Sequence, residues 1–297
     1  MTNQPVIFTQ ALSKRYGQSA VVRELNLSIE RNQITAFLGR NGAGKSTTIK
    51  MLLGMTRPSA GSGTVLGKQI TNSQESRELR HRVAYVPEDK PLYSYMTVEQ
   101  TIRFASSFYA DWRPEVARKL LRDCELPLQR KVKMLSKGMR TKLALLLAFA
   151  RRPDLLILDE PSEGLDPVGT EYLLELLVAQ NAEGVSVFFS SHQIAEVERV
   201  ADRVCILDKG CLLMDASLDQ LRQFYRRIDL LFAAPPRERE FQIPGVKRID
   251  SSGRQMRILA SGNAEAVVEK AHELKALSVE VVPVGLRDIF LHTVREN

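Results

Sequence analysis

A glycine-rich loop, GRNGAGKST at residues 39–47, constrains the fold of this chain more than any other stretch. It follows a short apolar run, ITAFLG at 34–39, and leads into a helix-like segment at about 44–53. The spacing G-x-x-x-x-G-K-[ST] between a strand and a helix lets backbone N–H groups surround phosphates. We therefore expect a nucleotide-binding α/β domain, with Lys45 on the phosphates and the Ser46 hydroxyl on Mg²⁺. A glycine-rich turn that merely opens a helix is the alternative, and the full motif in this context disfavours it.

The first two thirds of the chain alternates β-like and helix-like segments. Amphipathic helix patterns, such as the one at 168–180, separate short β-rich runs. This order predicts an α/β fold, with a parallel sheet covered by helices on both faces and an antiparallel β patch at the N-terminus. The expected strands of the parallel sheet are 34–39, 83–86, 155–159, 185–191 and 203–207.

Two stretches depart from this alternation. Residues 88–150 read as helices with no strand between them, which predicts a helical subdomain inserted into the sheet domain. Residues 226–297 turn to short β runs and two helices, which predicts a small α+β appendage after a main domain at 1–225. The appendage carries no catalytic cluster, and we expect its His272 and His292 at the surface.

Composition excludes several other classes of protein. The longest apolar run, 143–150, is far shorter than the roughly 20 residues that span a bilayer, and the N-terminus lacks the features of a secretory signal. Three cysteines without a CxxC pair indicate a reducing, cytoplasmic location. The net charge of +7 is spread along the chain without a basic arm, so we expect no nucleic-acid partner. The same charge suits phosphate ligands and an anionic membrane surface equally.

Three polar residues stand at the carboxyl ends of expected strands, where ligands bind in open α/β sheets. Asp159 and Glu160 end the run LLILDE, and His192 follows FFSS. We expect Asp159 to hold Mg²⁺ directly or through water, Glu160 to polarise an attacking water, and His192 to hydrogen-bond the terminal phosphate. Structural roles for the acidic pair and for a lone histidine are the alternatives.

A second predicted helix N-terminus that favours an anion lies far from the phosphate loop. In LSKGMRTKL at 135–143, Ser136 is placed to cap a helix whose N-terminal N–H groups favour an anion. A capped helix without a ligand is the alternative.

These pieces in this order resemble the ATP-binding cassette (ABC) ATPases over about residues 5–220, and the resemblance is closest to the ATPases of ABC-2-type exporters. The motifs that match are Walker A (GRNGAGKST), the signature segment (LSKGM, 135–139), Walker B (LLILDE), the D-loop (EGLD, 163–166) and the switch histidine, His192. The resemblance implies a P-loop ATPase that binds ATP and Mg²⁺. Its implied nucleotide contacts are Tyr16 (stacked on adenine), Gly39, Arg40, Asn41, Gly42, Ala43, Gly44, Lys45, Ser46, Thr47, Glu88, Ser136, Gly138 and Asp166, its metal ligands Ser46, Asp159 and Glu88, and its catalytic residues Glu160 and His192.

The resemblance also implies that two chains pair head-to-tail. Ser136 and Gly138 of one copy would then contact the nucleotide held by the phosphate loop of the other. One loop and one signature segment per chain make two complete sites only in a two-fold pair.

Two positions depart from the family pattern. Glu88 stands where the family usually has Gln, and it adds negative charge beside the phosphates. Lys137 replaces the second signature glycine, and Met139 the following Gln. Lys137 would be strained if its position needed a positive φ, and we expect that the glycine is dispensable.

The resemblance implies a separate transmembrane permease as partner, with this subunit on the cytoplasmic face of the cell membrane. Aromatic residues cluster around Glu88, where they suit either a docking groove for the permease or the core of the helical subdomain. An importer subunit, and a soluble ABC ATPase acting on ribosomes or nucleic acid, are the alternative functions. The clustered aromatic residues are Tyr85, Tyr93, Tyr95, Phe104, Phe108, Tyr109 and Trp112.

Overall fold

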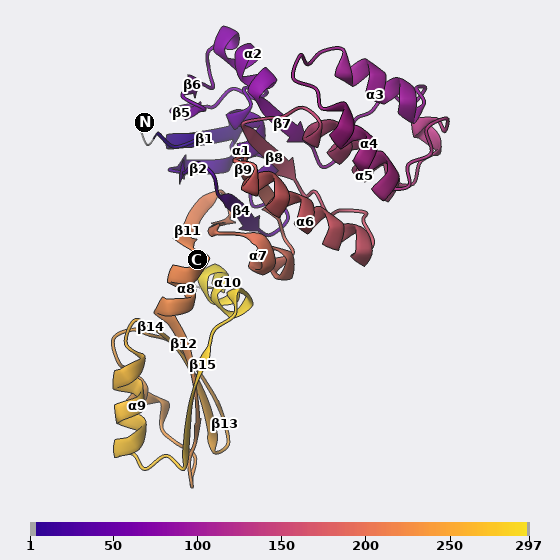
Figure 1. Ribbon diagram of the computed structural model, residues 1–297. Helices are drawn as coiled ribbons and strands as arrows, with labels where there is room; N and C mark the ends of the chain where they lie inside the picture. Colours follow the sequence, from indigo (N-terminus) through magenta and orange to yellow (C-terminus); the bar gives the residue numbers. More distant parts are fainter. Residues whose placement is uncertain (1–3, 296–297) are drawn as a thin grey trace. The chain divides into compact units, whose positions relative to one another are not determined.

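The computed structural model describes residues 4–295, which divide into two compact units. The first unit runs to Asp215 and the second begins at Ala216 (Figure 1). The division falls within strand β11 (Cys211–Ser217), upstream of residue 225, where the sequence analysis ended the main domain. Each unit has its own sheet and its own core.

The central sheet of the first unit has six strands in the order β11-β10-β4-β9-β8-β7. Every residue of β4 is buried, as expected of an apolar run inside a parallel sheet. The pairs from β10 across to β7 are parallel, and β11 follows β10 after a two-residue turn that only antiparallel neighbours allow. The predicted parallel sheet is therefore confirmed, with strands β4 (Ile34–Gly39), β7 (Val83–Val86), β8 (Leu155–Asp159), β9 (Ser186–Ser191) and β10 (Arg203–Asp208).

The register of this sheet brings the carboxyl ends of three strands together. Strand β9 lies between β4 and β8, with Leu38 opposite Ser191 and Asp159 opposite Ser190. The segments that follow β4, β8 and β9 therefore leave the sheet at one edge. These segments begin with the phosphate loop, Glu160 and His192.

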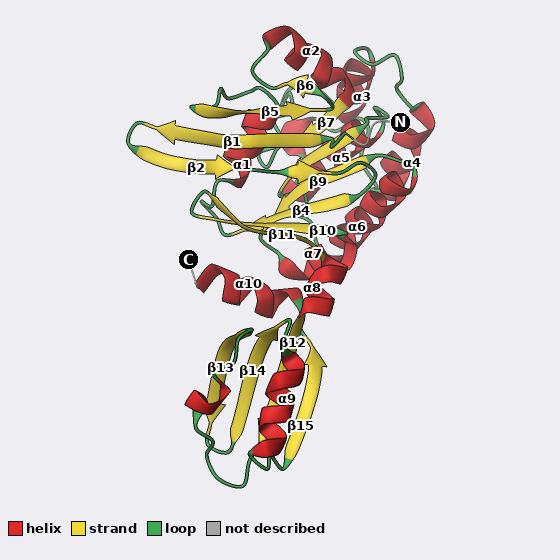
Figure 2. Cartoon of the chain, turned by 90° about the vertical axis from the view of Figure 1, so that its left-hand side faces the viewer, coloured by secondary structure: helices red, strands yellow, loops and turns green. Residues whose placement is uncertain are grey.

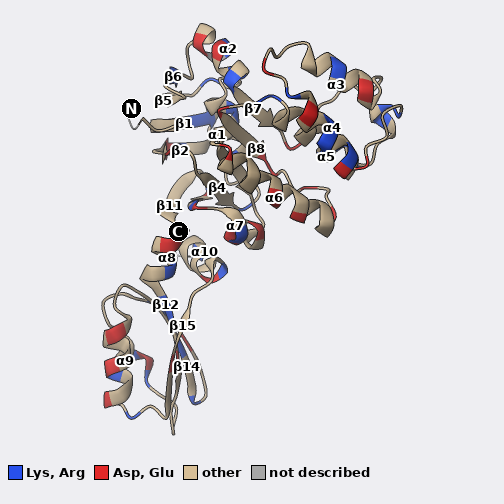
Figure 3. Ribbon diagram, viewed as in Figure 1, with Lys and Arg blue, Asp and Glu red and all other residues tan. Residues whose placement is uncertain are grey.

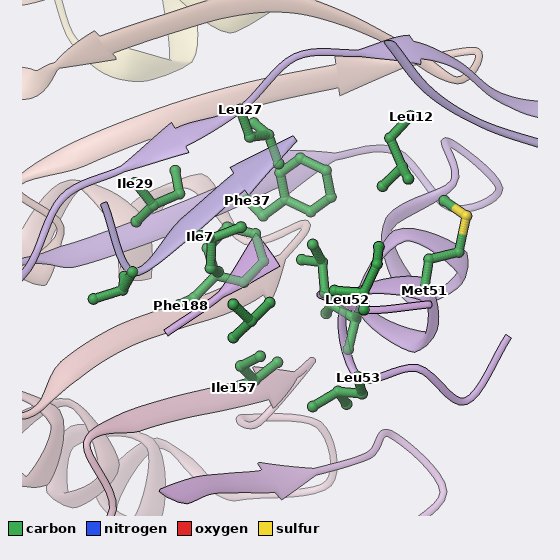
Figure 4. Packing of buried hydrophobic residues seen from close by; sticks show 14 of the residues in the cluster. Ile7, Leu12, Leu27, Ile29, Phe37, Met51, Leu52, Leu53, Ile157 and Phe188 are labelled. Atoms are coloured by element: carbon green, nitrogen blue, oxygen red, sulfur yellow. The ribbon is translucent and has the colours of Figure 1, made fainter. Parts of the chain in front are cut away.

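An antiparallel sheet forms the N-terminal patch that the sequence predicted. Its strands follow the order β2-β1-β5-β6, with β3 also paired to β1. Apolar residues of this sheet, of the central sheet and of helix α1 make one core, in which the rings of Phe37 and Phe188 lie 5.3 Å apart (Figure 4). The elements are β1 (Ile7–Tyr16), β2 (Ser19–Leu25), β3 (Ser28–Ile29), α1 (Lys45–Leu52), β5 (Ala60–Val65) and β6 (Lys68–Gln69).

Residues 88–150 form the helical insertion between β7 and β8. Local chemistry starts its helices: Thr97 and Gln100 form a capping box at the first, and Ser136 Oγ accepts the Met139 N–H (3.2 Å) at the last. Arg113 ties the insertion to the rest of the unit, because its guanidinium contacts the Glu183 carboxylate (2.6 Å). The helices are α3 (Val98–Ser106), α4 (Pro114–Asp123), η1 (Val132–Met134) and α5 (Lys137–Phe149).

The remaining helices of the first unit are α2 (Ser73–Arg82), α6 (Pro167–Ala182) and α7 (Ile194–Val200). Within residues 4–295, the structure holds no helix that combines the length and apolarity needed to cross a bilayer. Figure 3 shows basic and acidic residues on several helices of this unit, with only basic charges on α5 (Lys137, Arg140 and Lys142) and only acidic charges on α6 (Glu171 and Glu175).

The second unit is the α+β appendage that the sequence predicted. Its antiparallel sheet has the order β13-β14-β12-β15, and α9 packs on one face of it (Figure 2). His272 is exposed as expected, but His292 is buried, because it lies on the inward side of α10 with Ile289. The elements are α8 (Leu218–Phe224), β12 (Tyr225–Leu231), η2 (Glu238–Phe241), β13 (Val246–Ser252), β14 (Gln255–Ser261), α9 (Ala264–Glu273), β15 (Ser278–Pro283) and α10 (Leu286–Arg295).

We expect Phe188→Ala to lower the free energy of unfolding of the first unit by about 3–5 kcal/mol, because it leaves a cavity beside Phe37. Denaturant unfolding followed by the fluorescence of Trp112, the only tryptophan of the chain, reports on this unit. Phe8→Ala is the matched control, since Phe8 is 43% exposed and should cost much less. Equal losses for the two variants would contradict the position of the core.

Candidate functional site

The phosphate loop connects β4 to α1. At two of its positions only glycine fits, because the backbone of a neighbouring strand lies too close for a side chain. A Cβ on Gly39 would lie 2.5 Å from the Leu207 carbonyl oxygen. A Cβ on Gly44, whose φ is +107°, would lie 2.7 Å from the Val21 carbonyl oxygen. The loop therefore sits tightly against β2 and β10, with the start of α1 directly behind it.

Lys45 occupies the centre of the site. It is buried, and its Nζ donates to the Gly39 carbonyl (2.8 Å) and lies 3.0 Å from Glu160 Oε1. An ammonium group held this way, at the positive end of α1, can donate hydrogen bonds to the oxygens of a phosphate bound in the loop.

Glu160 connects the phosphate loop to the histidine after β9. Its other carboxylate oxygen, Oε2, lies 2.8 Å from Nδ1 of His192. Its N–H donates to Ser190 Oγ (3.0 Å), and that hydroxyl donates to Asp159 Oδ1 (2.5 Å). The structure thus brings Lys45, Asp159, Glu160 and His192 into one network through a serine that the sequence analysis did not single out.

A cleft of about 1040 Å³ opens over this network. The predicted residues that line it are Arg40, Asn41, Gly42, Ala43, Gly44, Lys45, Ser46, Thr47, Glu88, Glu160 and His192. The predicted residues outside its lining are Tyr16, Gly39, Ser136, Gly138, Asp159 and Asp166. Gly39 and Asp159 end the strands beneath the cleft.

Tyr16 and Asp166 do not line the cleft, although Leu165 and Pro167, the neighbours of Asp166, do. Tyr16 is an exposed residue at the end of β1, and Lys14 Nζ lies 4.9 Å from the centre of its ring. Asp166 caps α6, where its side chain accepts the Gly169 N–H (2.7 Å).

Acidic residues gather beside the cleft, and they fit a divalent cation. Burial, and then the carboxylates of Glu163, Asp159 and Glu160, raise the pKa of Glu88. A bound cation would favour the ionised forms. Within the described residues no three of His, Cys, Asp and Glu converge as a protein-only metal site. Hydroxyl and carboxylate oxygens from Ser46, Asp159 and Glu88 suit Mg²⁺, which takes its other ligands from phosphates and water.

The signature segment packs against the D-loop of the same chain. Lys137 Nζ forms an ion pair with the Glu163 carboxylate, and that hydrogen bond is the main reason why the pKa of Glu163 is lowered. Thr141 Oγ1 donates to the Glu163 carbonyl (3.2 Å), and a Cβ on Gly138 would lie 2.7 Å from the Gly164 carbonyl oxygen. Lys137 begins α5 without a positive φ, so its replacement of a glycine causes no backbone strain.

Sequence reasoning did not find Lys90 or Ser190, and it did not predict that Lys137 of the signature segment pairs with Glu163 of the D-loop. Glu163 and Lys137 are 26 residues apart and meet only through the packing of α5 on the D-loop. Lys90 is buried, and its Nζ donates to the Glu160 carbonyl (3.4 Å). Burial lowers the pKa of Lys90, while the Glu163 carboxylate opposes that effect. Ser190 had a usable signal, because it directly precedes the carboxyl end of a predicted strand.

The chain is similar to known proteins over most of its length. A family model described as ABC transporter matches residues 22–163, and one described as AAA domain, putative AbiEii toxin, type IV TA system, matches 129–198. The ABC transporter ATP-binding protein YtrB of Bacillus subtilis is 30% identical over 96% of this chain and 97% of its own length. The Nod factor export ATP-binding protein I of Ralstonia nicotianae is 30% identical over 97% and 93%.

A solved structure, the ATP-binding subunit of an ABC transporter, has a TM-score of 0.67 and 34% identity. The likeness covers 73% of this chain and 92% of that one. The similarity to YtrB and to the Nod factor export protein covers 96% and 97% of this chain and so extends through both units.

We expect Gly138→Ala to destabilise the first unit by about 1–3 kcal/mol, since the new Cβ meets a backbone oxygen of the D-loop. The same change in an ordinary helix is stabilising by roughly 0.5–1 kcal/mol, so the sign of the change in the free energy of unfolding tests the contact. Arg140→Ala, at an exposed position of the same helix, should change stability by less than about 0.5 kcal/mol. Denaturant unfolding measures both, and stabilisation by Gly138→Ala would contradict the contact.

Proposed function

Since this chain belongs to the ABC transporter family of ATP-binding proteins, we propose that two copies pair head-to-tail and enclose ATP between them. The chain is an ATPase and the ATP-binding subunit of a transporter. The proposal adds which residues act at the site and where the subunit docks.

This proposal is supported by the separation, within one chain, of the phosphate-loop cleft from the capped start of α5. Lys45, Glu160 and His192 share one cleft, whereas Ser136 and Gly138 do not line it. Ser136 is exposed at the start of α5, where its hydroxyl caps the helix and leaves further N–H groups at a positive dipole end. A second copy supplies this helix start to the nucleotide, and a two-fold pair completes both sites.

Phosphate binding starts from the ion pair between Lys45 and Glu160. The terminal phosphate competes with the Glu160 carboxylate for Lys45 Nζ, because both are anions within reach of one ammonium group. The carboxylate, parted from Lys45, accepts a proton from the attacking water, and His192 hydrogen-bonds the phosphate. ATP thus prepares its own hydrolysis by displacing this contact.

Ser46 and Asp159 would hold Mg²⁺ at the site, with Glu88 as a further oxygen ligand. When bound, it neutralises charge that develops on the phosphates. Tyr16 stacks on the adenine, and Asp166 and the rest of the D-loop contribute to the pairing face.

Docking to a membrane permease is supported by an exposed aromatic patch, which we define as Tyr93, Tyr95, Phe104 and Phe108. Their rings contact one another at centroid distances of 5.0–5.8 Å, yet each side chain is at least 40% exposed. Such clusters anchor protein partners. Tyr85 instead packs against the core and serves structure.

Export across a membrane, with this subunit on its cytoplasmic face, is the direction of transport that we propose. It is supported by similarity over 97% of this chain to a Nod factor export protein and by Lys137 in the signature segment. Glu88 at the cleft agrees with the same assignment.

We expect Glu160→Gln to retain ATP binding and to lose turnover at least about 100-fold, because the amide cannot accept the proton of the attacking water. With ATP the variant should accumulate as a dimer in sedimentation experiments. A Glu160→Gln protein that stays monomeric with ATP would contradict the paired site.

We expect Lys45→Ala, in contrast, to weaken ATP binding about 10- to 100-fold in a fluorescence titration, since a charged phosphate contact is lost.

We expect Phe104→Ala/Phe108→Ala to abolish co-purification with the membrane partner while the ATPase activity of the isolated subunit is kept. The patch lies outside the cleft, so the two readouts separate. Phe224→Ala is the matched control, because Phe224 is as exposed as Phe108 but lies in the second unit. Partner binding by the double variant at the wild-type level would contradict the docking site.

A further inference from the structure

Lys90 is a buried cation that the proposed mechanism leaves without a role. It lies in the loop after β7, two residues beyond Glu88, and only 5% of it is exposed. It does not line the cleft, so it lies behind the residues that face a nucleotide. A lysine in such a place needs partners, because burial of an ammonium group is unfavourable without them.

The partner of Lys90 is the backbone of Glu160. Lys90 Nζ donates to the Glu160 carbonyl oxygen at 3.4 Å, which joins the loop after β7 to the segment after β8. The loop itself turns where the Lys90 N–H donates to the Pro87 carbonyl (3.3 Å). The Glu163 carboxylate stands close enough to favour the charged lysine electrostatically.

Glu160 needs this support because its backbone is unusual. Its φ is +47°, in the left-handed region that residues other than glycine rarely adopt. Both polar groups of the residue are fixed: the N–H donates to Ser190 Oγ (3.0 Å), and the carbonyl accepts from the Glu163 N–H (3.2 Å) and from Lys90 Nζ (3.4 Å). Such conformations persist where surrounding contacts hold them, and they often place a side chain for function.

The left-handed turn determines where the Glu160 carboxylate lies. It projects back over the sheet edge, with Oε1 at 3.0 Å from Lys45 Nζ and Oε2 at 2.8 Å from His192 Nδ1. A change in the peptide after Glu160 would move the carboxylate relative to both. Displacements of about 1 Å at a reacting group can cost about 100-fold in rate.

We propose that Lys90 is a positioning residue for ATP hydrolysis, which holds the backbone of Glu160 in its left-handed turn and so places the carboxylate. The inference rests on the catalytic role proposed above for Glu160. A hydrogen bond from a cation to a carbonyl is stronger than one from a neutral donor, which suits this task.

The experiment compares Lys90→Met with Lys90→Arg in the full chain. Methionine keeps much of the apolar volume and removes the donor, so we expect kcat to fall about 10-fold while KM for ATP stays within about twofold. Arginine keeps a cationic donor, and its kcat should stay within about threefold of wild type. Asp89→Asn changes a charge at the exposed neighbouring position and should leave kcat within about twofold.

Thermal unfolding and Glu160→Gln complete the experiment. An unchanged kcat for Lys90→Met would overturn the role of Lys90, as would parallel losses of kcat, ATP affinity and thermal stability in both the Met and Arg variants. If Glu160→Gln is inactive while Lys90→Met is fully active, only the positioning role fails. If Glu160→Gln keeps wild-type turnover, the proposed catalytic role itself fails.

Discussion

The ion pair between Lys45 and Glu160 is the interaction on which the rest of the site depends. The two charged atoms lie 3.0 Å apart, and both side chains are buried. A buried charge that loses an opposite neighbour is strongly destabilising, so each residue holds the other in the site. A phosphate can replace the carboxylate at the lysine without leaving that lysine unpaired, which makes the pair an exchangeable contact.

The strand order makes this pair possible. Because β9 lies between β4 and β8, the lysine after β4 and the glutamate after β8 face each other across the end of β9. That strand supplies Ser190, which bonds the Glu160 N–H, and His192 follows it directly and contacts the Glu160 carboxylate. A single parallel sheet thereby assembles residues from three distant parts of the chain.

The sequence predicted this architecture well where apolar runs and spacing determine the outcome. β4, β7 and β8 have the predicted bounds, because each is a short apolar run between polar or glycine-containing segments. His292 shows the limit of such reasoning, since its burial depends on which side of α10 faces inward. The contact of Lys90 with Glu160 and the Lys137–Glu163 ion pair form between loops and helices that meet only after folding, and no local sequence pattern predicts them. Some residues implied by family resemblance line the cleft, some lie buried beneath it and others are exposed elsewhere, and sequence spacing alone does not separate these groups.

Helix α5 is fastened at both of its ends. At its start, Lys137 and Thr141 bind Glu163 of the D-loop, and at its end the Arg113 guanidinium donates to the Phe149 carbonyl (2.7 Å). Thirteen helical residues make a rod of about 20 Å. Because both of its ends are tied by side-chain contacts, α5 links the D-loop to Arg113 at the start of α4. The length of one helix therefore sets the spacing between these two segments of the first unit.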